Sequence, residues 1–187
     1  MTLFDRLTRS FANRFRSRPI NRVPSPVLAK TTPWLSILLA SLLPALPVIA
    51  SAPVLPPFGL LMLLAWRQVR PGFLPIWAGL PLGFFDDLFS GQPLGSAILL
   101  WSLIMIVLDA IDARFPWRSY WLDWLVSAVL ICACQALGLA FANMSGGSAA
   151  IGVLVPQLAT AILLYPLAGR LVSTLDRLRL LPIVELD

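Results

Sequence analysis

The sequence predicts an all-α integral membrane protein, a bundle of six transmembrane helices with both chain ends in the cytoplasm. The 187-residue chain is 58% hydrophobic and only 12% charged, with a mean hydropathy of +0.84, whereas soluble domains carry about 25% charged residues. Its apolar runs have the length of transmembrane helices rather than that of the roughly 10-residue strands of a membrane barrel. Its Lys and Arg residues lie between these runs, in segments that six crossings would place on one side of the membrane.

The first part of the chain, residues 1–33, is a basic segment that we expect in the cytoplasm. Six arginines and Lys30 precede the first apolar run, and such an excess of positive charge marks cytoplasmic segments. Within residues 2–18, apolar side chains recur every fourth position between the arginines. This pattern predicts a basic amphipathic helix on an anionic membrane surface, with a disordered basic tail as the alternative. Prolines at positions 19, 24 and 26 predict a linker over residues 19–33.

Six apolar segments follow in order. The predicted spans are residues 34–52, 58–66, 73–88, 95–111, 122–142 and 151–172. They form a bundle over residues 34–172, and residues 173–187 form a short cytoplasmic tail. The second segment is short, so a re-entrant segment is its alternative. With six spans every Lys and Arg falls on the inner side, and with five this segregation breaks, which favours six.

The residue types limit the chemistry. The chain has no histidine, which excludes Ser-His-Asp and Cys-His catalysis and histidine metal sites. Cys132 and Cys134 lie two positions apart in an apolar helix, so they cannot pair with each other and are interpreted as small buried side chains. We expect no cofactor, no metal, no catalytic residue and no nucleic-acid partner.

The stretch 83–95 is where two adjacent acids interrupt a long apolar context. Asp86 and Asp87 stand between two uncharged runs, and Gly91, Pro93 and Gly95 break the backbone after them. An ionised carboxylate inside a membrane costs roughly 2.5–3.5 kcal/mol on insertion scales unless it reaches water or a partner. The two acids are therefore predicted at the hinge between the third and fourth spans, with Asp86 nearer the outer interface.

A face of small residues leads to this hinge. Gly79, Gly83 and Asp87 are spaced by four and share one helix face. Faces of small residues are where another helix backbone can approach closely. This spacing predicts that Asp87 points toward the bundle rather than toward lipid.

Several roles are open for the acids. A metal or phosphate enzyme is disfavoured, because the outer side has no basic clamp and no second acidic cluster. A proton relay would use Asp86, Asp87 and Asp109. In the purely structural interpretation, Asp87 hydrogen-bonds the hinge backbone over residues 91–95. At the next turn, Asp112 and Asp123 are expected to pair locally with neighbouring arginines.

One protein family has a central motif of this kind. The arrangement Gly83-x-x-x-Asp87-Leu88-x-Ser90-Gly91-x-x-Leu94-Gly95 resembles the motif of the rod shape-determining protein MreD family. The context is similar over roughly residues 34–179, with a basic N-terminus, a short second span bounded by prolines, and a last span with a Tyr-Pro pair before basic residues. Asp86 stands where other members often have an apolar residue.

The resemblance implies a non-enzymatic scaffold in the cell inner membrane. MreD-like proteins are partners of the single-span protein MreC, in the complex that connects MreB filaments to the glycosyltransferase RodA and its transpeptidase during peptidoglycan synthesis and cell-shape determination. The fold it implies is similar to the substrate-binding membrane subunits of vitamin transporters, so a small-molecule-binding transporter subunit is the alternative function. Asp87, Gly91 and Gly95 match the family motif. We hypothesise that the Gly79–Gly83–Asp87 face and the hinge shape the surface that receives the partner.

Overall fold

The computed structural model describes residues 22–23, 26–45, 55–115, 119–180 and 184–185, and all structural statements below refer to these ranges. The predicted amphipathic helix over residues 2–18 lies outside them. The α-helices are α2 (Pro26–Leu42), α3 (Phe58–Val69), α4 (Gly79–Ser90), α5 (Ser96–Arg114), α6 (Tyr120–Met144) and α7 (Leu154–Arg179). Short 3-10 turns are η1 (Leu43–Ala45), η2 (Ile76–Ala78) and η3 (Ile151–Val153), and two-residue strands β1 (Arg22–Val23) and β2 (Val184–Glu185) pair antiparallel.

The predicted all-α membrane fold is confirmed, but the number of six membrane spans is not. In the described ranges, three helical segments are long and apolar enough to cross a membrane, namely Ser96–Arg114, Tyr120–Met144 and Ile151–Arg179. The chain is therefore a membrane protein. Helix α3 is apolar but has only 12 residues, and α2 has 17, so the crossing of all six helices stays a prediction.

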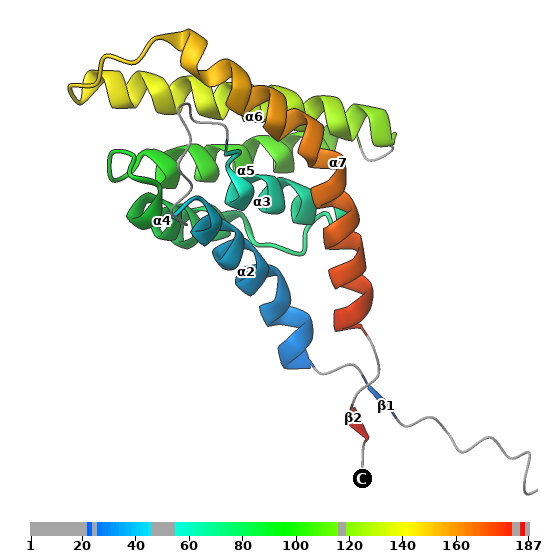
Figure 1. The fold of residues 1–187 in the computed structure, drawn as a ribbon. Coiled ribbons are helices and arrows are strands. Elements are labelled where there is room, and N and C mark those ends of the chain that lie inside the picture. The colour runs from blue at the N-terminus through cyan, green and yellow to red at the C-terminus, as the bar shows by residue number, and fades with distance from the viewer. Residues whose placement is uncertain (1–21, 24–25, 46–54, 116–118, 181–183, 186–187) are drawn as a thin grey trace, which may run out of the picture.

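Helix α3 forms the centre of the core. Its residues from Gly59 to Arg67 are all buried, and α2, α6 and α7 pack against it. Figure 1 shows α3 enclosed by the longer helices, with α4 and α5 side by side at one side of the bundle. The short helix at the centre is thus shielded by protein rather than exposed along its length, which explains how a segment too short for an ordinary span is accommodated.

The predicted linker over residues 19–33 is wrong for its second half, because α2 already begins at Pro26. A proline is tolerated in the first turn of a helix, where no N–H donor is needed. Pro33 lies in the interior of α2 and therefore cannot donate to the carbonyl of Ala29, four residues earlier. Arg179 of α7 donates from Nη1 to that carbonyl oxygen at 2.6 Å. A side chain from the last helix thus replaces the missing hydrogen bond.

In helix α7, too, a side chain of another helix replaces a hydrogen bond that a proline cannot make. Pro166 lies in its interior, which deprives the Ile162 carbonyl of its helical donor. The indole Nε1–H of Trp124 in α6 donates to this oxygen at 3.4 Å. Figure 1 shows α7 running along α6 and then turning away toward the start of α2, and a proline in the helix interior is an ordinary cause of such a bend.

Other helix bounds also differ from the predicted spans. The first helix ends at Leu42 and is followed by the turn η1, in which Pro44 lacks the N–H that a continuing helix requires; residues 46–52 of the predicted first span lie outside the described ranges. The third begins with η2 rather than at Phe73, because Pro75 precedes it in an extended conformation. Helix α7 continues to Arg179, beyond the predicted end at residue 172.

The described Lys and Arg residues gather at one end of the bundle, which we call the arginine end. They are Arg22, Lys30, Arg67, Arg70, Arg114, Arg170, Arg177 and Arg179. Contacts join the helix ends that carry them: Arg67 reaches Asp109 at 2.8 Å, and Arg70 reaches Asp176 at 2.9 Å. The opposite end carries the hinge between α4 and α5, so the two polar regions of the bundle lie at opposite ends.

Candidate functional site

The predicted hinge is a tight hairpin between α4 and α5. Helix α4 ends at Ser90 and α5 begins at Ser96. Gly91 and Gly95 have φ angles of 69° and 97°, in the left-handed region that only glycine enters without strain. Pro93 is half-buried between them, and its carbonyl accepts from the Ser96 N–H at 3.1 Å. The glycines and the proline therefore fix the path of the chain between the helices.

Asp87 holds the start of α5. Its side chain is buried, and its two oxygens accept hydrogen bonds from the backbone N–H groups of Gly95 and Ala97, both at 2.9 Å, and of Ile98 at 3.2 Å. The Ser96 hydroxyl donates to the same carboxylate at 3.2 Å. Ala97 and Ile98 lie in the first turn of α5 and Gly95 directly precedes it, so these N–H groups have no acceptor within the helix. Asp87 therefore caps the neighbouring helix, and of the hinge backbone over residues 91–95 that the structural interpretation predicted, it binds the N–H of Gly95.

The Gly79–Gly83 face packs against α5 of the same chain. A Cβ added at Gly79 would lie 2.8 Å from backbone atoms of Ser102, and one added at Gly83 would lie 2.6 Å from the Ala97 carbonyl oxygen. Backbones this close require glycine. The close helix approach that the sequence indicated therefore occurs within the chain, and this face is not open to another protein in this arrangement.

Asp86 points to a different part of the bundle. It is half-buried and lies beside Gly59 of α3 and Ser41 of α2: a Cβ added at Gly59 would lie 3.2 Å from Asp86 Oδ1 and 2.0 Å from Ser41 Oγ. The two adjacent acids thus face different helices. Asp87 contacts α5, whereas Asp86 faces α2 and α3 rather than the outer interface.

Asp109 is far from this pair. Twelve residues of continuous helix separate it from Ala97, which corresponds to about 18 Å. It pairs with Arg67 at the arginine end, so the structure does not bring the three acids of the suggested relay together. In the described ranges, no group of three or more His, Cys, Asp or Glu side chains could hold a metal ion.

The arginine end contains a network of ion pairs. Arg67 is fully buried and contacts both Asp109, at 2.8 Å, and Asp112, at 3.6 Å. Asp112 thus has an ion-pair partner from α3, which the expected local pairing with a neighbouring arginine did not include. A single arginine among apolar residues looks like a topology signal in the sequence, and only the packing of α3 against α5 reveals its ion pairs.

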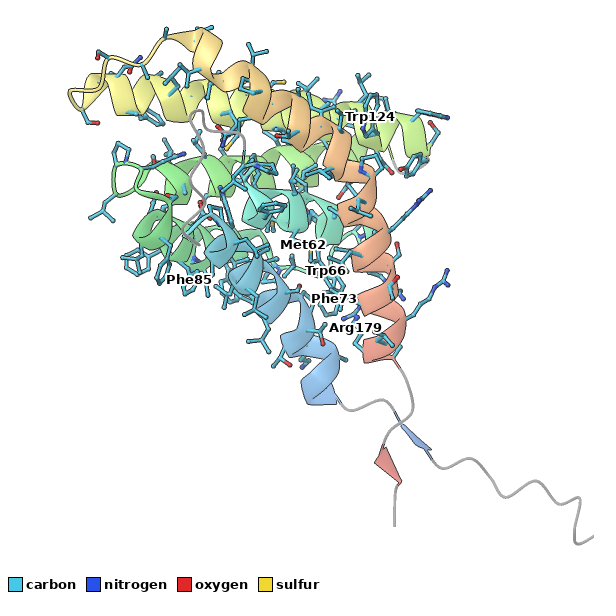
Figure 2. The ribbon with its side chains drawn as sticks, viewed as in Figure 1. Met62, Trp66, Phe73, Phe85, Trp124 and Arg179 are labelled. Atoms are coloured by element: carbon cyan, nitrogen blue, oxygen red, sulfur yellow. The ribbon has the colours of Figure 1, made fainter. Side chains whose placement is uncertain are left out.

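Arg179 is the second buried arginine of this end. It pairs with Asp176 at 2.6 Å, and its guanidinium lies over the ring of Phe73, 4.1 Å from the centroid, and over that of Trp66 at 5.3 Å. Figure 2 shows Arg179 directed from α7 toward Phe73 and Trp66. Arginine favours such positions because its planar cation stacks on aromatic faces while donating hydrogen bonds. The sequence predicted this residue only as part of a basic tail.

A cavity of about 700 Å³ lies between α3, α6 and α7 at the arginine end. Its lining includes Gln68, Asp123, Trp124, Tyr165, Arg170 and Arg177. Gln68 joins the three helices, because its amide donates to Ser127 Oγ at 2.8 Å and to the Asp123 carbonyl at 3.0 Å, while Tyr165 donates to its oxygen. This polar network gives the cavity a fixed wall.

The fold and these sites define a helical membrane protein whose central motif is a helix hairpin held by a buried carboxylate. Comparisons with protein-family models, with curated proteins and with solved structures find no match for this chain.

Proposed function

We propose that the chain is a non-enzymatic membrane scaffold of the MreD kind. It acts at the cell inner membrane and docks an MreC-like single-span partner within the complex that directs peptidoglycan synthesis and cell shape. The observation that carries the proposal is the hairpin over residues 83–95. The residues that resemble the family motif, Asp87, Gly91 and Gly95, form one structural unit.

The chemistry of the hairpin favours a scaffold over an enzyme. The carboxylate of Asp87 accepts four hydrogen bonds from the start of α5, so its lone pairs are occupied by the protein itself. A general acid or base needs an oxygen that reaches substrate or water. Asp87 is instead placed to keep α4 and α5 in one rigid unit, which a docking protein requires.

The partner then needs another surface than the Gly79–Gly83 face. An apolar groove of about 420 Å³ runs between α2, α3 and α7, and Leu39 and Leu167 on its rim are exposed. Ala40 and Ala168 in its lining are small, which permits close approach of another helix in a membrane. We assign this groove to the transmembrane helix of the single-span partner.

The test is recovery of the partner from native membranes in mild detergent, with a tagged chain and mass spectrometry. The wild-type chain is expected to enrich an MreC-like protein together with cell-wall synthesis enzymes. Ala168→Phe fills the groove and should reduce recovery, whereas Ala159→Phe makes the same change at an exposed position of α7 and should not. Enrichment of an ATP-binding transporter module instead would contradict the scaffold function.

We also propose that all six helices cross the membrane, with the arginine end in the cytoplasm. The collection of the described Lys and Arg residues at one end supports this orientation. Single cysteines at Ser148, in the turn between α6 and α7, and at Arg177 test it in a chain without Cys132 and Cys134. Membrane-impermeant reagents added to intact cells should label position 148 and not position 177, and the reverse pattern would refute the orientation.

The second candidate function is a small-molecule-binding subunit of a transporter, which the 700 Å³ cavity favours because its volume is typical of ligand sites. Such a subunit would show thermal stabilisation in detergent by a water-soluble ligand. A scaffold would depend on its protein partner instead.

A further inference from the structure

The α7 wall of the 700 Å³ cavity carries a stripe of donors. Arg170, Ser173, Thr174 and Arg177 all line the cavity, and their spacing of three and four residues places them on one face of α7. Both arginines are exposed, and neither has an ion-pair partner among the residues that the structure describes. Arg67, Arg70 and Arg179 at the same end are paired with acids. Arg170 and Arg177 are the cations of this end that line the cavity, and both can attract a ligand there.

The cavity lies where the apolar part of the bundle ends. Residues 151–169 contain no charged side chain and, at 1.5 Å per residue, are about 28 Å long, close to the roughly 30 Å of a bilayer's hydrocarbon core. Arg170 is the first charge after them. On the facing helix, Tyr120 and Trp124 line the same cavity, and such aromatic side chains favour the headgroup level. A ligand in this cavity would therefore contact lipid headgroups and chains at once.

The α6 wall of the cavity carries a negative charge. Asp123 of α6 lines the cavity across from the arginines of α7. Apolar surface from Ala65, Val69 and Pro166 lies between them. The cavity therefore combines two cations, one carboxylate and an apolar surface, which matches a molecule that carries a phosphate, a hydrogen-bond donor and an acyl chain.

We propose that this cavity binds a phospholipid. Its phosphate pairs with Arg170 and Arg177, and the hydroxyl or ammonium donor of its headgroup faces Asp123. The acyl chains leave the cavity along α7 into the bilayer. Cations near a membrane surface attract anionic lipid by about 1 kcal/mol each, which corresponds to about fivefold in affinity. This inference is independent of the scaffold function, since it concerns only the described residues of this end.

The experiment uses the full-length chain, purified in detergent and depleted of lipid. Binding of phosphatidylglycerol, phosphatidylethanolamine and phosphatidylcholine is measured by native mass spectrometry and by lipid-dependent thermal stabilisation. The variant Arg170→Gln/Arg177→Gln should weaken binding of the first two lipids by about 10-fold or more. The control is Arg114→Gln, which removes an exposed arginine of the same end outside the cavity and should bind like wild type.

Two further measurements test whether the ligand is a lipid or free phosphate, and whether binding needs the arginine side chains or only their charge. Inorganic phosphate at millimolar concentration should not displace the lipid, because it lacks the acyl chains; complete displacement would identify a free-phosphate site and overturn the proposal. Arg170→Lys/Arg177→Lys keeps the charge and should retain most of the binding. If the Gln pair does not fold, each single Gln variant is measured. Equal lipid binding by the Gln variants and Arg114→Gln would also overturn the proposal.

Discussion

Removal of the Asp87 carboxylate should loosen the α4–α5 hairpin. The change Asp87→Ala leaves three N–H groups at the start of α5 without their acceptor. Ala97 is the most buried of these residues, with 4% of its surface exposed, and an unpaired buried donor costs about 1–3 kcal/mol. Loss of a helix cap, which is the same kind of change, costs about 0.5–2 kcal/mol in other proteins. The free energy of unfolding should therefore fall by about 1–3 kcal/mol, a decrease in Tm of about 2–12 °C.

The assay is thermal unfolding in detergent, followed by size-exclusion chromatography of the heated protein. Asp86→Ala is the matched control, because it removes the adjacent carboxylate, which makes none of these bonds to α5. Asp87→Asn retains one acceptor oxygen and should give an intermediate Tm. If Asp87→Ala and Asp86→Ala lower the Tm equally, the hydrogen bonds to α5 do not hold the hairpin, and the reasoning is refuted.

Three other substitutions test the packing by the same unfolding assay. Gly83→Ala should destabilise the bundle by about 1–3 kcal/mol through overpacking against α5, while Gly152→Ala, with nothing within 4 Å of the added atom, should not. Arg67→Ala leaves the half-exposed Asp109 and the more buried Asp112 without their partner and should cost about 1–3 kcal/mol; a loss below 1 kcal/mol would mean that water replaces the arginine. Trp124→Phe should cost about 1 kcal/mol in the wild-type chain but little in a Pro166→Ala background, where residue 166 regains an N–H that can donate to the Ile162 carbonyl. Equal costs in both backgrounds would mean that the Trp124 indole does not replace the hydrogen bond lost at Pro166.

The apolar pattern predicted where helices exist better than where they begin and end. Helices α5 and α6 match their predicted spans closely, because their hydrophobic runs are bounded by glycine, proline and charges. The start of α2 was missed because prolines at 19, 24 and 26 were interpreted as helix breakers and the linker was extended to residue 33. Their effect depends on whether the N–H is needed and whether another group meets the released carbonyl, and here Arg179 does so from the far end of the sequence.

In the candidate site, too, some features could be predicted from the sequence and others could not. The local spacing of Gly79, Gly83 and Asp87 predicted correctly that they share an inward face, because helix geometry alone determines it. The partner of that face was not predictable, since α5 of this chain and a helix of another protein present similar backbones. The ion pairs of Arg67 and the cavity beside Arg170 depend on which helix ends meet, and no local pattern in the sequence specifies that.

At Pro33 and Pro166, side chains of other helices replace the missing helical hydrogen bonds, and this affects the order in which the helices assemble. Each proline releases a carbonyl that stays unpaired until another helix arrives: α6 supplies the donor for Ile162, and the end of α7 supplies the one for Ala29. During synthesis, α2 must therefore wait for the last turn of α7, and the strand pair β1–β2 joins the same two regions. The first helix becomes fully satisfied only when the last has been made, so a chain truncated before residue 179 should remain open at this end and be an early substrate for membrane proteases.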